Sequence, residues 1–273
     1  MGALDVGGWE LGVVMEHVDL LVFGPHPDDL EIGLGATIAK HVAMGLRVGL
    51  CDLTAGEMGS NGTVEERLAE ADAAREVLGA EWRVNLRWPD RAIGSADDHA
   101  RSATELIRRA RPRAVALPYW LDRHPDHVDA SDVLTGAIFN SGLRKYRAGG
   151  EPWKPEMTSY YFINESAQPS FVIDVTDYYQ TKRRALACHA SQFRPPAADA
   201  VRTRLTSPRF MTLIESRDAQ FGALAGVDFA EGFIVREPLI RPHLLRDWRV
   251  QKDAPSPEQE VPPSADYPDK AGR

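Results

Sequence analysis

The sequence predicts an α/β fold: a Rossmann-like, mostly parallel sheet with helices on both faces and an added C-terminal layer of strands and helices. Short apolar runs recur through the first half of the chain without polar alternation, which is typical of strands buried on both faces. Segments with helical periodicity separate these runs at the spacing of βαβ units. The pattern changes after Gly149-Gly150, and this change indicates the added layer.

In the first half, predicted strands and helices alternate in order along the chain. Thr63-Val64-Glu65-Glu66 has the form of a capping box, and Gly79 ends the helix that this box begins. Pro112 ends the next predicted helix. The expected strands cover residues 18–23, 47–53, 84–88 and 114–118, and the expected helices cover 32–44, 64–78, 97–111 and 128–143.

In the second half, apolar runs at 158–164 and 171–175 predict two strands that could pair antiparallel. Helices are expected at 178–191 and 210–224. No internal repeat or clear domain boundary interrupts the chain, so a single domain is expected over residues 15–250.

The two ends of the chain are expected to lie outside that domain. Residues 1–14 lack the basic start of a secretory signal and carry Asp5 and Glu10, so they read as a loose N-terminal extension. Residues 251–273 contain five prolines, many charges and little apolar content. Such a composition predicts a disordered tail.

Composition excludes several classes of partner. The net charge is −8 and no basic stripe appears, so we expect no nucleic-acid partner, because that binding depends on Lys and Arg neutralising phosphates. No apolar run approaches the ~20 residues of a membrane span, so no membrane partner is expected. Cys51 and Cys188 lie far apart in the sequence and read as free thiols of a cytoplasmic protein.

Two short histidine–aspartate clusters carry the chemistry. His26-Pro27-Asp28-Asp29 and His124-Pro125-Asp126-His127 each follow a predicted strand and precede a predicted helix. Carboxyl ends of parallel strands meet at one sheet edge, so these loops should converge there. Neutral imidazoles and carboxylates are ligands that Zn²⁺ accepts in catalytic sites with one open position. One cluster alone could simply cap a helix, but two on one edge predict metal-assisted hydrolysis.

These clusters resemble the two metal motifs of the LmbE-like (PIG-L) zinc deacetylases. The run from Gly24 to Gly33 is similar to the first motif and His124-Pro125-Asp126-His127 to the second. The resemblance extends from about Val18 to about Leu245. Further segments are most similar to the branch that deacetylates N-acetylglucosaminyl malate in bacillithiol synthesis: residues 53–57 followed by 60–63 and Arg67, residues 86–91, Ser191-Gln192-Phe193 and Ala230-Glu231-Gly232-Phe233.

The resemblance implies a metal site and a general base. His26, Asp29 and His127 would hold one Zn²⁺ per chain, leaving a position for water and the acetyl oxygen of the substrate. Zn²⁺ lowers the pKa of its bound water to about 7, so a nearby carboxylate suffices as base. Asp28, which is not a ligand, would take that role. Fe²⁺ or Co²⁺ could occupy the same ligands.

The resemblance also implies a role for the other two residues of the second motif. His124, oriented by Asp126, would stabilise the oxyanion and could protonate the departing amine. A carboxylate partner favours a charged imidazole, and a charged imidazole cannot bind a metal. The alternative, that His124 is a fourth metal ligand, stays open.

Substrate contacts are expected from the loop before the second helix and from the residue before the second motif. Arg67 and Arg123 would bind the malate dicarboxylate, because arginine holds carboxylates in a bidentate fork. Ser60 and Asn61 would lie beside them. For each arginine the alternative is a solvated surface position or, for Arg67, a helix pair with a nearby glutamate.

The leading functional hypothesis is a zinc-dependent deacetylase acting on N-acetylglucosaminyl malate, a small-molecule amino-sugar substrate. The alternative keeps the chemistry but changes the substrate to a mycothiol-type precursor, a thiol conjugate or a chito-oligosaccharide. A nucleotide-binding module is disfavoured because Gly33-Leu34-Gly35 lacks the third glycine of the phosphate-binding motif. A non-catalytic metal-binding scaffold would not need Asp28. Family members often form trimers or hexamers, so the resemblance also implies a homo-oligomer.

Overall fold

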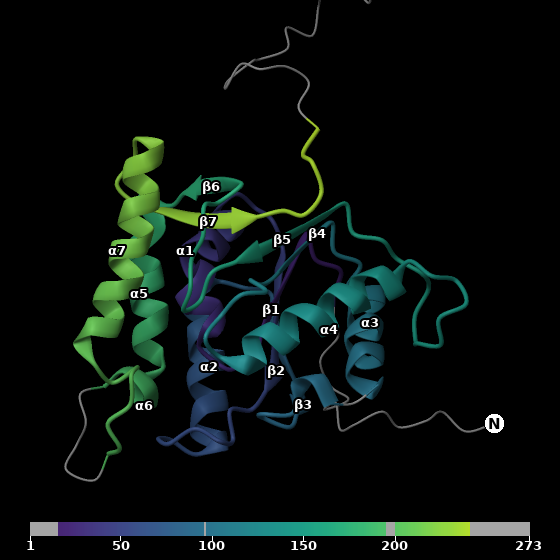
Figure 1. Cartoon of the computed structure of the whole chain (residues 1–273), viewed down its shortest axis with the longest axis horizontal. Coiled ribbons are helices and arrows are strands. Elements are labelled where there is room, and N and C mark those ends of the chain that lie inside the picture. Colours follow the sequence, from purple (N-terminus) through teal and green to yellow (C-terminus); the bar gives the residue numbers. More distant parts are fainter. Residues whose placement is uncertain (1–15, 96, 195–199, 241–273) are drawn as a thin grey trace, which may run out of the picture. The chain divides into compact units, whose positions relative to one another are not determined.

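The computed structural model describes residues 16–95, 97–194 and 200–240 (Figure 1). One compact unit runs to Glu237, and Pro238 begins a second unit. The segments 1–14 and 251–273 lie outside the described residues, as does the predicted domain end at residue 250.

A single sheet with the strand order β3-β2-β1-β4-β5-β7-β6 forms the centre of the described unit. Strands β3 to β5 in this order are parallel, and β7 pairs antiparallel with both β5 and β6. The strands are β1 (Leu20–Gly24), β2 (Val48–Thr54), β3 (Trp82–Trp88), β4 (Ala114–Pro118), β5 (Met157–Tyr161), β6 (Phe171–Asp174) and β7 (Ala230–Ile234).

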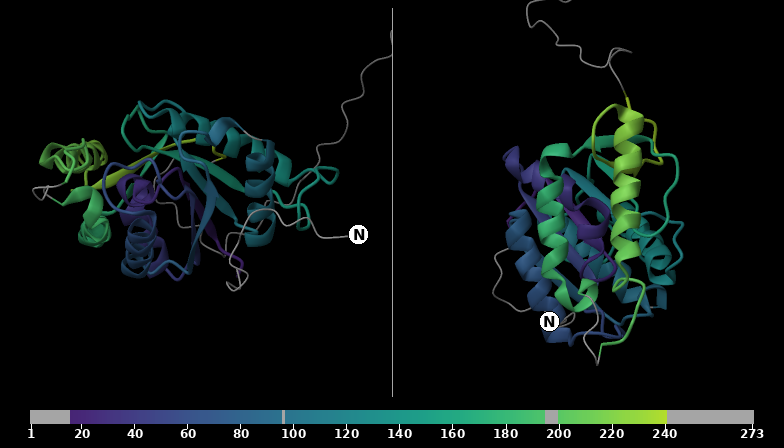
Figure 2. Two further views of the ribbon diagram at one scale, coloured as in Figure 1. Left: turned by 90° about the horizontal axis from the view of Figure 1, so that it is seen from below. Right: turned by 90° about the vertical axis from the view of Figure 1, so that its left-hand side faces the viewer.

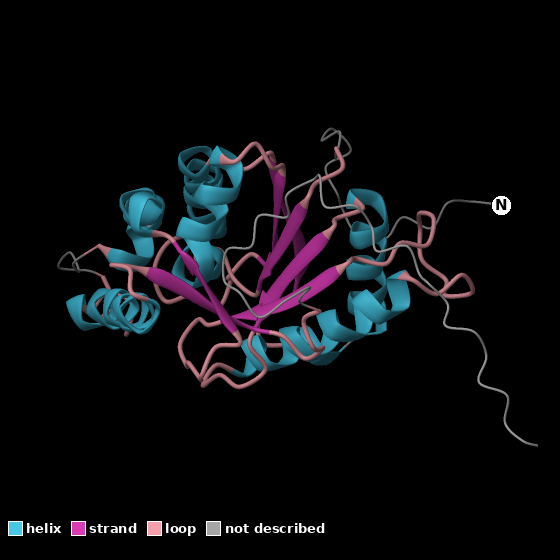
Figure 3. Cartoon of the chain, turned by 90° about the horizontal axis from the view of Figure 1, so that it is seen from above, coloured by secondary structure: helices cyan, strands magenta, loops and turns pink. Residues whose placement is uncertain are grey.

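Helices cover both faces of this sheet (Figures 2 and 3). The helices are α1 (Asp29–Ala43), α2 (Val64–Leu78), α3 (Asp97–Ala110), α4 (Pro125–Ser141), α5 (Tyr179–Cys188), α6 (Ala190–Phe193) and α7 (Pro208–Ala225), with 3₁₀ turns at Ile93–Ser95 and Thr176–Tyr178. Alternate residues of β1 enter two different cores. Leu21 and Phe23 pack in the core with α3 and α4, whereas Leu20 and Val22 pack in the core with α1, α2, α5 and α7. The predicted α/β class with a mostly parallel sheet is therefore confirmed.

Local signals located one helix accurately. Thr63 Oγ1 accepts a hydrogen bond from the Glu66 N–H (3.1 Å), and Gly79 ends α2 in the left-handed conformation at φ 75°. Glycine adopts this conformation without the Cβ clash that other residues meet.

Several boundaries differ from the prediction. Helices α1 and α4 begin three residues earlier than expected, because polar motif residues form their first turns. The predicted helix 178–191 is two helices that meet at His189. Strand β5 runs parallel to β4, so it does not pair antiparallel with β6, and β7 was not predicted. Within the described residues, none of the helices has the length and hydropathy of a membrane span.

The chain order of the strands reverses between β1 and β4, which are hydrogen-bonded neighbours with Val22 opposite Ala116. Ligands of open α/β sheets bind beyond the carboxyl ends of the strands at such a point. The loops that follow β1 and β4 carry the two histidine–aspartate motifs. The fold therefore brings together two segments about a hundred residues apart.

Candidate metal centre

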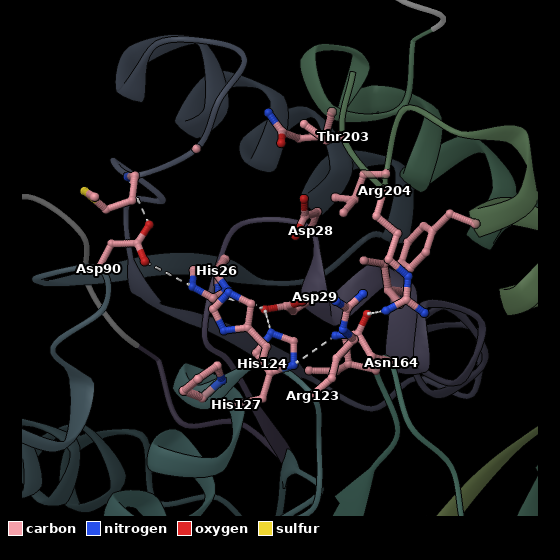
Figure 4. Close-up of a pocket in the computed structure, with 18 of the residues that line it drawn as sticks. His26, Asp28, Asp29, Asp90, Arg123, His124, His127, Asn164, Thr203 and Arg204 are labelled. Carbon is pink, nitrogen blue, oxygen red and sulfur yellow. Dashed lines mark hydrogen bonds and ion pairs between the residues drawn. The ribbon is translucent and has the colours of Figure 1, made fainter. Parts of the chain in front are cut away.

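Both motifs line one pocket of about 380 Å³ (Figure 4). His26, Asp28 and Asp29 reach it from the turn between β1 and α1, and His124 and His127 from the turn between β4 and α4. Further lining comes from later segments of the chain, including Asn164, Gln192, Thr203, Arg204, Leu205 and Phe210.

Three buried side chains in this pocket form a donor set for a metal ion. Asp29 Oδ2 lies 3.0 Å from His26 Nδ1 and 3.3 Å from His127 Nε2. One ligand atom from each of the three residues lies within 4.8 Å of the others. Two imidazole nitrogens and one carboxylate oxygen match the protein ligands of catalytic Zn²⁺ sites. The donor chemistry therefore fits Zn²⁺ at the three residues that the sequence singled out.

The surrounding carboxylates favour a positive charge at this point. Burial opposes a charge on both rings, but Asp126 and Asp29 outweigh it at His26 and hold the pKa of that ring well above its usual range. At His127, Asp29 and Asp122 likewise outweigh burial and raise the pKa to about 9. A site that binds protons this strongly also offers a metal cation a favourable electrostatic environment.

Each histidine of this donor set also has a carboxylate at its other ring nitrogen. His26 Nε2 lies 3.3 Å from Asp126 Oδ2 and 3.4 Å from Asp90 Oδ1, and His127 Nδ1 lies 3.1 Å from Asp122 Oδ1. Such partners fix the ring orientation of metal-binding histidines and make them better ligands. Neither Asp90 nor Asp122 belongs to the two sequence motifs.

Asp28 occupies a strained and buried position beside the donor set. Its backbone has φ 122°, a conformation that costs a non-glycine residue about 1–3 kcal/mol. Among the described residues, its Oδ2 atom has no hydrogen-bond partner, although Arg67 Nη2 lies 3.6 Å away. Burial raises the pKa of Asp28 to about 6, and the Arg67 charge offsets part of that effect. Strain and a buried oxygen without a hydrogen-bond partner in the described part of the chain make Asp28 a candidate functional carboxylate.

The predicted pairing of the His124 ring with the Asp126 carboxylate is wrong. The Asp126 carboxylate instead accepts hydrogen bonds from the Arg91 N–H (2.8 Å) and from Arg91 Nη1 (2.7 Å). His124 Nδ1 accepts the Asp126 main-chain N–H at 3.2 Å, because His124 is the N-cap residue of α4. Burial and the neighbouring His127 and His26 lower the pKa of His124. This ring is therefore neutral, with its proton on Nε2.

The four expected substrate contacts divide into two pairs. Arg67 and Arg123 line the pocket, whereas Ser60 and Asn61 do not. Arg67 is buried and donates to Gly56 O (2.8 Å) and Pro27 O (3.0 Å), so it braces the turn that carries Asp28. Arg123 is exposed.

Asn61 holds a distant segment rather than facing the pocket. Its Nδ2 donates to Val201 O and its Oδ1 accepts from the Val201 N–H, each at 2.9 Å. Ser60 is exposed to solvent.

Among the pocket residues from the second half of the chain, no motif indicated Asn164 or Arg204. Asn164 donates its Nδ2 to Asp122 Oδ1 (3.0 Å), and Arg204 Nη1 donates to Asn164 Oδ1 (3.3 Å). The sequence signal that could have indicated Asp122 is its position two residues before His124. Asp90 lies in the segment 86–91, which resembles one branch of the deacetylase family.

Comparison with known proteins identifies the family. Residues 21–138 match the family model described as PIG-L, GlcNAc-PI de-N-acetylase. The diacetylchitobiose deacetylase of Thermococcus kodakarensis is 30% identical over 228 residues, which are 78% of this chain and 81% of that protein. A 1D-myo-inositol 2-acetamido-2-deoxy-alpha-D-glucopyranoside deacetylase of Segniliparus rotundus is 27% identical over 63% of this chain and 76% of its own length.

A solved structure supports the same assignment. The conserved protein TT1542 from Thermus thermophilus superposes with a TM-score of 0.76 at 36% identity, over 84% of this chain and 100% of that one. The chain therefore belongs to the PIG-L (LmbE-like) family and is a deacetylase, an amide hydrolase of a metal-dependent family.

Proposed function

We propose that this chain is a zinc-dependent deacetylase that hydrolyses the N-acetyl amide of an N-acetylglucosamine unit in a small glycoconjugate. The observation that carries the proposal is the buried Asp28 Oδ2, which accepts no hydrogen bond from the described residues and lies beside the donor set of His26, Asp29 and His127. A metal-binding scaffold needs the three ligands but has no use for a strained carboxylate next to them. The names of the two relatives support the amino-sugar substrate, because both describe acetylated glucosamine compounds.

In this proposal the position of each residue in the pocket determines its role in the reaction. Bound Zn²⁺ would polarise the acetyl carbonyl and acidify the attacking water. Asp28 takes the proton from that water, since its Oδ2 accepts no hydrogen bond from the described residues and its raised pKa suits a general base near neutral pH. His124 donates its Nε2–H to the developing oxyanion, because its Nδ1 is occupied as an acceptor. Asp28 then returns the proton to the departing amine.

The substrate is better described by the alternative hypothesis than by N-acetylglucosaminyl malate. One relative is named for a chito-disaccharide and the other for an inositol glycoside, and neither name contains malate. Arg67, expected to grip the malate, donates instead to two main-chain carbonyls beside Asp28. The malate conjugate remains the second candidate, because Arg123 and Arg204 line the same pocket.

Acetate release separates these substrates. The purified protein with Zn²⁺ would be assayed on diacetylchitobiose, on the inositol glycoside, on N-acetylglucosaminyl malate and on free N-acetylglucosamine. We expect the highest kcat/KM on one of the first two. A highest value on the malate conjugate would restore the bacillithiol assignment, and no acetate from any of the four would overturn the proposed substrate class.

Assembly is a separate part of the proposal. A trimer or hexamer is expected from the family resemblance, and light scattering of the purified protein measures it directly. A monomeric mass would overturn that expectation without affecting the proposed chemistry.

A further inference from the structure

Helix α1 is kinked one turn after the metal-binding residues. Leu34, inside the helix, has the non-helical angles φ −147° and ψ 27°. In an unkinked helix the Ala36 N–H would donate to the carbonyl of Ile32. Here the Ala36 N–H donates to Glu231 Oε1 (3.2 Å), and the Ile32 carbonyl accepts from Arg217 Nη2 (2.8 Å). Two charged side chains from later elements therefore hold the two sides of the kink.

These two side chains belong to one buried chain of charges. Glu231 Oε1 accepts from Lys182 Nζ (2.7 Å), which also donates to Asp218 Oδ2 (2.7 Å). Asp218 Oδ1 accepts from Arg217 Nε at 2.9 Å. All four side chains are buried, and they come from α5, α7 and β7. Two acids balance two bases, so the group carries no net charge into the interior.

The Arg217 guanidinium also reaches the segment that supports His127. Its Nη1 donates to the carbonyls of Phe162 and Ile163, each at 2.9 Å. The next residue, Asn164, donates to Asp122, and Asp122 contacts His127. One side chain thus contacts the first turn of α1 and the segment behind the second motif (Figure 4 shows Asn164 beside the site).

The first turn of α1, which Arg217 contacts at the Ile32 carbonyl, is packed tightly against β5 at Gly33. Gly33, the residue before Leu34, lies so close to β5 that a Cβ atom there would stand 2.1 Å from Tyr161 Cδ2. The hydroxyl of Tyr161 donates to Phe23 O (2.8 Å), so this side chain is fixed against β1. The short turn from Asp29 to Gly33 is therefore packed against Tyr161 and anchored by Arg217.

We propose that Arg217 and Glu231 are positioning residues of the metal centre. By holding helix α1 on the two sides of its kink at Leu34, they fix where Asp28 and Asp29 lie relative to His127. The inference rests on the proposed metal site. Displacements of about 1 Å at a catalytic group can cost on the order of 100-fold in rate, so a fixed turn matters for chemistry. It also gives a role to Ala230-Glu231-Gly232-Phe233, the segment that the mechanism did not use.

The test compares Arg217→Lys and Glu231→Gln with a matched control, Arg108→Lys. Arg108 is also buried and donates to main-chain carbonyls, among them Ser141 O (3.1 Å) and Leu143 O (2.7 Å). These groups lie at the C-terminal end of α4, opposite the end that carries His127. Measurements are the Kd for Zn²⁺ by chelator competition, kcat and KM at saturating Zn²⁺, and thermal unfolding of each variant.

For Arg217→Lys we expect Zn²⁺ affinity to fall about tenfold, at the low end of the range for residues outside the ligand shell. We also expect kcat at saturating Zn²⁺ to fall about tenfold while KM changes little, because Asp28 is displaced. Arg108→Lys should lower the unfolding temperature and leave Kd and kcat as in the parent protein. If Glu231→Gln does not fold, Arg217→Lys decides, since it keeps the charge beside Asp218.

Two results would overturn the inference. One is a folded Arg217→Lys variant with the Kd and kcat of the parent. The other is an equal loss of Zn²⁺ affinity in Arg108→Lys, which would assign the effect to general destabilisation. A parent protein that binds no Zn²⁺ would instead contradict the proposed metal site itself.

Discussion

The two turns that carry the histidine–aspartate motifs share the tripeptide His-Pro-Asp, but the following helix begins at a different position in each. Helix α1 begins at Asp29, three residues after His26, whereas α4 begins at Pro125, directly after His124. Asp28 therefore occupies the N-cap position with φ 122°, whereas the corresponding Asp126 lies inside the first turn of its helix.

This offset gives the two aspartates opposite environments. Asp126 accepts two hydrogen bonds from Arg91 and lies beside His26, so its oxygens are occupied. Asp28 retains a buried oxygen without a hydrogen-bond partner in the described part of the chain. In the proposed mechanism, the residue at which each helix starts therefore decides which aspartate is placed to act as the base and which one orients a metal ligand.

The largest effect that tests this contrast is expected from Asp28→Asn. The amide has nearly the shape of the carboxylate but cannot accept a proton, so kcat should fall about 10³-fold, within the usual range for a general base. Zn²⁺ content should stay at the parental level, because Asp28 is not a ligand in the proposed site. Acetate release and metal analysis measure the two quantities, and a parental kcat would remove Asp28 from the mechanism.

Asp122→Asn tests the orienting carboxylates of the second turn. Asp122 lies 3.1 Å from His127 Nδ1 and also accepts the His124 N–H at 2.8 Å. Loss of its charge should weaken Zn²⁺ binding about 10- to 100-fold, as chelator competition would report. Unchanged affinity would show that the His127 ring is held by other contacts.

Asp28→Gly separates the cost of the strained turn from its use. Glycine adopts φ 122° without a Cβ clash, and the strain of an L-residue there is about 1–3 kcal/mol. Urea unfolding of the metal-free protein measures the free energy of unfolding. After correction for the stability that glycine loses through its extra backbone entropy in the unfolded chain, this free energy should be about 1 kcal/mol higher than in the parent. The matched variant Asp126→Asn should lose stability, since it weakens the Arg91 contacts. A corrected free energy of unfolding below that of the parent would argue against stored strain.

The smallest effect is expected at the pocket rim. An exposed ion pair contributes at most about 1 kcal/mol, so Arg123→Ala should raise KM for N-acetylglucosaminyl malate no more than about fivefold. KM for the uncharged diacetylchitobiose should not change, and Ser60→Ala should change neither value. Equal KM increases on both substrates would mean that Arg123 contacts the sugar rather than the acid.

Local sequence signals predicted the parallel half of the fold because each helix and strand there has a pattern within its own residues. The capping box at Thr63 and the apolar runs of β1, β2 and β4 are read from neighbouring residues. Strand β7 and the pairing of β5 with β4 depend instead on contacts between distant segments. The early start of α1 was missed because Asp29 and Glu31 are buried charged residues, which break the apolar periodicity used to find helices.

The residues of the candidate metal centre could be predicted because each motif keeps its residues together in the sequence. Asp90 and Asn164 reach the site from other loops, and no fixed spacing connects them to the motifs. Asp122 lies in the loop of the second motif, two residues before His124, but the motif itself does not include it. The predicted contact between the His124 ring and the Asp126 carboxylate is wrong for a different reason. Their spacing of two residues suggests a contact between side chains, but the N-cap conformation of His124 directs its ring to the Asp126 main-chain N–H.

Crystals grown with Zn²⁺ and measured across the zinc absorption edge would test the central claim most directly. The account predicts one anomalous peak per chain, about 2.0–2.2 Å from ligand atoms of His26, Asp29 and His127. Asp28 should stay outside bonding distance of that peak. A peak held by His124 and Asp126 without Asp29, or no peak in this pocket, would contradict the account.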